Sequence, residues 1–186
     1  MNINQEIAYI HDVINKVWLE DISNDYSNKC LLKEDSLKNA LYFHLRRRLG
    51  DDFLTENNLR IFTEYYVDGE RIDLVIVEID KDKAEEYFLG DCVKRVLAVV
   101  EIKFKSGLVS DSVFYKDVDK ILSFIQSWGS ETKHYLAFVQ ERYYKTRDVE
   151  SWIKDKHLDI VKGKLTELYS YWDEDSDEVI WSSLEH

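Results

Sequence analysis

The sequence contains no proline and only six glycines, so the residues that most often mark turns are scarce. Its two cysteines, Cys30 and Cys92, lie far apart and outside any CxxC spacing. This pattern excludes a disulfide framework and a thiolate zinc site, and it favours a reducing, cytoplasmic location. No apolar run approaches the roughly 18–20 residues that span a membrane, and residues 1–6 show no secretory signal. We therefore expect no membrane partner.

Positive charge is also scarce. Lys and Arg total 25 against 37 Asp and Glu, which gives a formal net charge of −12. This excess argues against a protein that coats nucleic acid without specificity, although a local basic groove is compatible with an acidic remainder. With 45% hydrophobic and 33% charged residues, the composition is typical of a globular protein.

The length of 186 residues predicts a single domain, which we assign to residues 1–183. The last three residues, Leu184-Glu185-His186, have two interpretations: they are native, or they are a tail derived from an expression vector. We leave these three residues out of the functional argument.

Apolar spacing predicts the secondary structure. Helices are expected over 3–18, from Glu34 to Gly50, from Asp111 or Ser112 to Trp128, and briefly around 149–153. Strands are expected over Leu59–Val67, Arg71–Ile79, Val93–Phe104 and His134–Gln140, with a hairpin turn at Asp68-Gly69. Residues 165–172 and 178–182 are expected to form a terminal hairpin, although the first of these segments also fits a helix.

This order of elements predicts an α/β fold. We expect a three-layer sandwich with a central four-stranded mixed β-sheet flanked by helices, plus a C-terminal β-hairpin. Val93–Phe104 is an almost unbroken apolar run, which is typical of a central strand buried on both faces.

Charged residues interrupt this apolar strand near its end. Glu101 and Lys103 share one face of it, and ionised groups inside an apolar strand are costly unless they are paired or bound. Asp73 lies in the preceding strand, so Asp73 and Glu101 converge if the two strands are neighbours.

Two converging carboxylates repel each other, and a hard divalent cation such as Mg²⁺ or Mn²⁺ removes that repulsion. Such a cation makes water easier to deprotonate and stabilises charge on a phosphoryl oxygen. A lysine beside it adds fixed positive charge near the transition state. The pattern of Asp73, Glu101 and Lys103 therefore predicts a site that cleaves phosphodiester bonds, with the two acids as metal ligands.

At these residues the sequence resembles the PD-(D/E)xK nuclease superfamily, which has the restriction-endonuclease-like fold. The resemblance covers residues 32–140 and includes Ile72-Asp73 and Glu101-Ile102-Lys103, with Ile72 in place of the proline that names the family. It implies that Asp73 and Glu101 are metal ligands and that Lys103 is the catalytic lysine. It also implies that Glu34, on the helix before the sheet, is an additional catalytic acid.

The acid-x-lysine pattern alone is weak, because it also occurs at Glu131–Lys133 in a polar loop. Other interpretations remain open for the matched residues. Glu101 and Lys103 also fit a structural ion pair, Asp73 fits an acid beside a turn, and Glu34 fits an acid favoured by the helix dipole.

Candidate nucleic-acid contacts are few. Arg46-Arg47-Arg48 with His44 form the clearest basic cluster, but basic residues also stabilise the C-terminal end of a helix. Lys116 and Lys120 lie one helical turn apart and fit the same cleft as the acids.

Taken together, these features predict a metal-dependent nuclease that hydrolyses phosphodiester bonds in DNA, of a restriction, repair or phage-defence type. Targeting is expected to come from a homodimer or a protein partner. The alternative is a catalytically inactive nuclease-fold protein that acts as an acidic protein-binding or DNA-mimicking module.

Overall fold

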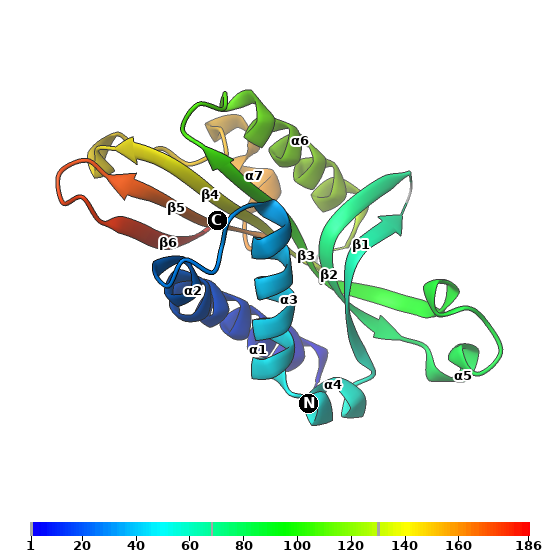
Figure 1. The fold of residues 1–186 in the computed structure, drawn as a ribbon. Coiled ribbons are helices and arrows are strands. Elements are labelled where there is room, and N and C mark those ends of the chain that lie inside the picture. Colours follow the sequence, from blue (N-terminus) through cyan, green and yellow to red (C-terminus); the bar gives the residue numbers. More distant parts are fainter. Residues whose placement is uncertain (1, 68, 130) are drawn as a thin grey trace.

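The computed structural model describes residues 2–67, 69–129 and 131–186. Its centre is one mixed sheet with the strand order β1-β2-β3-β4-β5-β6 (Figure 1). The strands are β1 Leu59–Val67, β2 Glu70–Ile79, β3 Val93–Ser106, β4 Lys133–Tyr144, β5 Leu165–Asp173 and β6 Val179–Glu185. β3, β4 and β5 are mutually parallel, whereas the β1–β2, β2–β3 and β5–β6 pairs are antiparallel.

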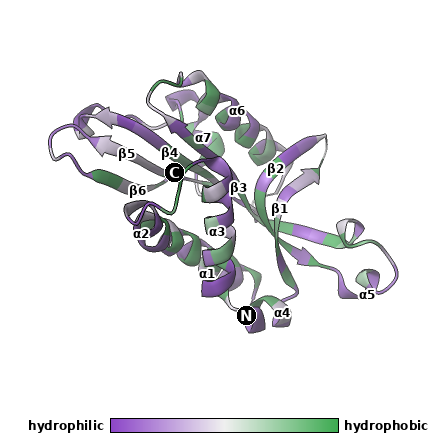
Figure 2. Ribbon diagram, viewed as in Figure 1, coloured by the Kyte–Doolittle hydropathy of each residue, from purple (hydrophilic) through white to green (hydrophobic). Residues whose placement is uncertain are grey.

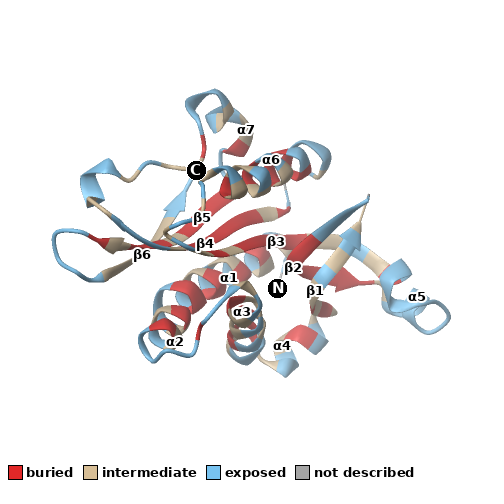
Figure 3. Ribbon diagram, turned by 45° about the horizontal axis from the view of Figure 1, so that its top comes forward, coloured by how far each residue is buried: buried red, intermediate tan, exposed pale blue. Residues whose placement is uncertain are grey.

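Helices cover both faces of the sheet, so the three layers expected from the sequence are present (Figure 3). None of the described helices combines the length and the hydropathy that crossing a bilayer requires. The helices are α1 Ile3–Lys16, a π-helical segment Val17–Ile22, α2 Ser23–Ser27, α3 Glu34–Leu49, α4 Asp51–Glu56, α5 Lys81–Ala84, α6 Ser112–Ser127 and α7 Leu158–Val161.

Two hydrophobic cores fill the space between these layers. One core joins α1, α2 and α3 to one face of the sheet, and the other joins α6 and α7 to the opposite face. Val99 and Val100 of β3 belong to different cores, which confirms the prediction of a central strand buried on both sides. Hydrophobic residues accordingly predominate in the middle of the sheet (Figure 2).

The prediction of a four-stranded sheet was wrong, because the sheet has six strands. The C-terminal hairpin forms as expected but extends the same sheet, with β5 parallel to β4. The reason is burial: Leu165 contributes to the α6 core and Leu168 to the α1–α3 core, so β5 needs cover on both faces. This also excludes the helical interpretation of residues 165–172.

Several boundaries agree with the sequence. β1 has the predicted bounds, and α3 begins at Glu34 and ends before Gly50, whose φ of +80° favours glycine. Gly69 likewise has a φ of +84°, while its predicted turn partner, Asp68, lies outside the described residues. The first helix continues beyond residue 18, through the π-helical segment into α2.

The short helix expected around 149–153 does not form, and that prediction was wrong. The buried carboxylate of Glu167 accepts hydrogen bonds from the Ser151 hydroxyl and from the Trp152 backbone N–H, at 2.5 and 2.9 Å. The Ser151 hydroxyl in turn accepts one from the Ile153 N–H. Side chains therefore satisfy these backbone donors in an irregular conformation.

The last three residues pack into the sheet. β6 includes Leu184 and Glu185, and Nε2 of His186 lies 2.7 Å from Glu167 Oε1. In this structure His186 therefore contributes to the environment of a buried carboxylate.

We expect Glu167→Ala to lower the free energy of unfolding by roughly 2–4 kcal/mol, because it leaves buried donors without an acceptor. Glu167→Gln, which retains an acceptor oxygen, should lose less. Urea denaturation measures both changes. Equal stability of Glu167→Ala and the unmodified protein would show that these contacts contribute nothing to the fold.

Candidate active site

The candidate site lies where β2 separates from β3. The ladder between these strands ends at the pair Leu74–Val100, although β2 extends back to Glu70 against β1. Figure 1 shows the hairpin end of β1 and β2 leaving β3 beside α6. Asp73 is the first residue beyond the ladder, and its Oδ2 accepts the Ile102 backbone N–H at 2.8 Å. This carboxylate therefore satisfies a backbone donor of β3 that β2 no longer pairs.

The backbone of β1 is also irregular at this level. Glu64 lies between the residues of β1 that pair with Leu74 and Ile72, and its φ is +56°. Such a conformation is costly for a residue with a side chain and is found disproportionately at functional sites. The side chain of Glu64 itself forms ion pairs at the surface with Lys38 and Arg71.

Glu101 is the most deeply buried acid of the site, with 1% of its surface exposed. Burial, followed by the neighbouring charge of Asp73, raises the pKa of Glu101 to about 8. Its Oε1 lies 2.8 Å from Nζ of Lys120, on α6. The charge of Asp73 thus disfavours the ionisation of Glu101, so the two carboxylates of β2 and β3 lie near each other, as expected from the sequence if the strands are neighbours.

Lys103 lies between acids from two different layers. Its Nζ is 3.0 Å from Asp117 Oδ2 on α6 and 3.4 Å from Glu34 Oε2 at the start of α3. Because α3 and α6 pack on opposite faces of the sheet, Lys103 must lie at the edge of β3 that β2 has left. Lys105 reaches the same oxygen of Glu34 at 3.3 Å.

Burial shapes the charges of the remaining groups. Burial raises the pKa of Asp73, although the hydrogen bond from the Ile102 N–H lowers it. Burial likewise raises the pKa of Asp117, although the contact with Lys103 lowers it. Burial lowers the pKa of Lys103, but Asp117, Glu34 and Asp73 outweigh it, so the pKa of this lysine is raised. Lys103 therefore stays protonated at neutral pH.

The structure thus brings Glu34, Asp73, Glu101 and Lys103 into one cluster, as their sequence context predicted. Asp35, the neighbouring alternative to Glu34, is exposed and pairs with Lys33. The second acid-x-lysine match takes no part in the cluster, since Glu131 lies near Arg95 and Lys133 binds the carbonyl of Gly163.

Asp117 is the member of the cluster that the sequence analysis missed. The signal was present, because Asp117 lies three residues after Phe114 and four before Ile121, both on the buried face of α6. Of the two lysines considered on this helix, Lys120 reaches the site and Lys116 is exposed.

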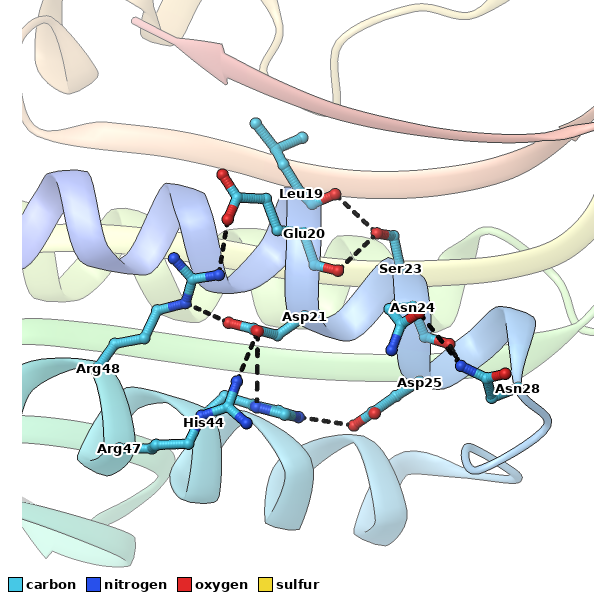
Figure 4. Close-up of polar contacts among 10 residues, drawn as sticks. All are labelled: Leu19, Glu20, Asp21, Ser23, Asn24, Asp25, Asn28, His44, Arg47 and Arg48. Atoms are coloured by element: carbon cyan, nitrogen blue, oxygen red, sulfur yellow. Dashed lines mark hydrogen bonds and ion pairs between the residues drawn. The ribbon is translucent and has the colours of Figure 1, made fainter.

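The basic cluster at the end of α3 is largely neutralised by acids. Figure 4 shows Arg47, Arg48 and His44 meeting acids of the segment 20–25. The contacts are Arg47 Nη2–Asp21 Oδ1 at 2.8 Å, Arg48 Nη2–Glu20 Oε2 at 2.6 Å, His44 Nε2–Asp25 Oδ2 at 2.7 Å and Arg46 Nε–Asp51 Oδ1 at 2.8 Å. These contacts link helices of one layer, which favours the structural interpretation of the arginines.

The donor set partly fits a divalent cation. Asp73 and Glu101 offer carboxylate oxygens, which Mg²⁺ prefers, and Mg²⁺ usually binds one or two carboxylates while retaining several waters. Oε1 of Glu101 is buried and forms no hydrogen bond, although it contacts Lys120. Within the described residues, no group of three or more His, Cys, Asp or Glu side chains is arranged to hold a metal ion. The residues therefore fit a two-carboxylate site, with Glu34 held by lysines.

Comparison with known proteins gives little further information. No family model matches the chain, and no curated protein matches its sequence. Among solved structures, the fold is similar to one described as the structure of P. aeruginosa ATCC27853 NucC in its cAAA-bound form. The two chains share 12% identity over 93% of this chain and 83% of that chain, with a TM-score of 0.48. A likeness this distant carries no argument about the site.

Proposed function

We propose that this chain is a metal-dependent nuclease and that it hydrolyses phosphodiester bonds in DNA. The observation that carries the proposal is the convergence of Asp73, Glu101 and Lys103 at the point where β2 leaves β3. Asp73 accepts the N–H of Ile102, the residue between the other two, so the three side chains are fixed by one backbone arrangement.

The charge pattern argues against one structural alternative, an ion pair between Glu101 and Lys103. A structural ion pair would join Glu101 to Lys103, whereas Glu101 pairs with Lys120 and Lys103 pairs with Asp117 and Glu34. Burial, followed by the charge of Asp73, raises the pKa of Glu101 to about 8, so ionising this carboxyl in the folded protein is costly. Strongly perturbed carboxyls that share a site are typical of functional centres.

Each residue has a defined role in the proposed reaction. Asp73 and Glu101 would hold Mg²⁺ or Mn²⁺, which supplies positive charge that activates water and stabilises the phosphoryl oxygens. Lys103, fixed between Asp117 and Glu34, would place its ammonium group beside the negative charge that develops in the transition state. Glu34 would orient Lys103.

A plasmid-cleavage assay in Mg²⁺, Mn²⁺ or EDTA tests the proposal. We expect cleavage with either cation and none in EDTA, and Lys103→Met should lower the rate roughly 100-fold or more. Glu131→Gln, at the exposed second acid-x-lysine match, is the control and should cleave like the unmodified protein. Lack of cleavage under all conditions would contradict the proposal.

That negative result would instead favour the inactive acidic module. Two features support this second candidate: the net charge of −12 and the pairing of Arg46, Arg47 and Arg48 with acids. These arginines are therefore less available to a phosphate backbone.

A further inference from the structure

Lys120 bridges the two strands at the point where they separate. Its Nζ lies 2.8 Å from Glu101 Oε1 of β3 and donates to the backbone carbonyl of Arg71 in β2. Only 18% of its side chain is exposed. Lys120, on α6, therefore contacts both β2 and β3 at the point where these strands separate.

The charge of Lys120 acts on both proposed metal ligands. Among the described residues, it is the cation that forms an ion pair with Glu101. Its charge also opposes the effect of burial on Asp73, where it lowers the pKa. In this structure Lys120 thus offsets the repulsion between Asp73 and Glu101, which is the role expected of a divalent cation at the same place.

We infer that Lys120 is an internal counter-ion that competes with the divalent cation for the Asp73–Glu101 pair. The inference rests on the proposed function and adds a means of controlling it. An ammonium group in contact with Glu101 repels a cation that approaches the same carboxylate. A metal therefore binds fully only when Lys120 withdraws, and its flexible four-carbon stem permits that movement.

Removal of Lys120 has two opposing effects on metal binding. It abolishes the repulsion of the metal, but it also makes Glu101 hold its proton more tightly, and the metal must displace that proton. A divalent ion carries twice the charge of a proton, so at similar distances the lost repulsion outweighs the tighter protonation. The expected direction is therefore stronger metal binding at any pH.

Isothermal titration with MnCl₂, without nucleic acid, measures this competition. We expect the Kd for Mn²⁺ to fall roughly tenfold in both Lys120→Met and Lys120→Gln. Lys120→Gln keeps a donor for the Arg71 carbonyl, so it separates the loss of charge from the loss of this hydrogen bond. Lys116→Met, one turn earlier on α6 at an exposed position, is the matched control and should leave the Kd unchanged. Thermal melts establish that each variant is folded.

Three results would overturn the inference. An equal or weaker affinity in both Lys120 variants would show that this lysine does not compete, while Mn²⁺ binding by the unmodified protein would leave the proposed function intact. A gain that survives the additional change Asp73→Asn would place the ion elsewhere. Absence of Mn²⁺ binding in every protein would remove the proposed function as well.

Discussion

Glu101→Gln is expected to abolish cation-dependent cleavage while stabilising the fold at alkaline pH. Cleavage should fall roughly 1,000-fold or more, because the neutral amide is a poor ligand for a hard cation and no longer fixes it opposite Asp73. The stability change follows from burial, which together with Asp73 raises the pKa of Glu101 to about 8. If an ordinary structural ion pair stabilised Glu101 instead, its replacement by Gln would destabilise the fold.

The pH dependence of this effect has a defined sign. The pKa of Glu101 is raised in the folded state above its ordinary value of 4.5, so folding favours the protonated form. With Glu101 protonated, below pH 4.5, the folded state therefore keeps its full stability. Ionisation of Glu101 lowers that stability as the pH rises through about 8. The difference in Tm between Glu101→Gln and the unmodified protein should grow over this window and then level off.

Thermal melts in EDTA between pH 5 and 9, with cleavage assays at one pH, measure both effects. Each unit of pKa difference corresponds to about 1.4 kcal/mol, so the trend is large enough to measure. Glu131→Gln, an exposed acid, should show no comparable trend. A Tm difference that does not change with pH would contradict the electrostatic account, and retained cleavage would contradict the role of Glu101.

Two substitutions of Asp73 should separate its structural role from its chemical role. We expect both Asp73→Asn and Asp73→Ala to lower cleavage roughly 100-fold or more, because each removes a charged ligand. Asp73→Asn keeps an oxygen that accepts the N–H of Ile102, so its stability should stay close to that of the unmodified protein. Asp73→Ala leaves this N–H unpaired and should lose about 1–3 kcal/mol.

Urea denaturation and cleavage assays on both variants provide the test. Both variants lose the same charge, so the difference in their free energies of unfolding reports the hydrogen bond to the Ile102 N–H. Cleavage by Asp73→Asn at the unmodified rate would show that this carboxylate serves only to cap the backbone of β3.

Much of the site could be predicted because its residues conflict with their surroundings. Glu101 interrupts an apolar strand whose neighbours Val100 and Ile102 are fully buried, and such a conflict is readable in sequence. The sequence left the pairing of β2 with β3 as a condition, since residues 80–92 separate the two strands. The structure shows them to be antiparallel neighbours, and with that condition met Asp73 lies near Glu101.

The rest depended on long-range geometry that sequence spacing does not encode. The sequence did not specify that β2 leaves β3 after Leu74, and this separation admits Lys120 and Asp117 from α6. Lys120 was expected to line the same cleft as the acids, but Asp117 was not assigned to the site, because it interleaves with Lys116 and Lys120 along the same helix. The parallel pairing of β5 with β4 was missed for a similar reason, because the register between distant strands leaves no local signal.

The central claim is that Asp73 and Glu101 together bind a divalent cation, and diffraction from crystals soaked in MnCl₂ tests it most directly. The account predicts an anomalous peak in contact with carboxylate oxygens of both residues, and its loss in Asp73→Asn crystals. A Mn²⁺ peak bound elsewhere, or no peak beside these two carboxylates at saturating Mn²⁺, would contradict the claim.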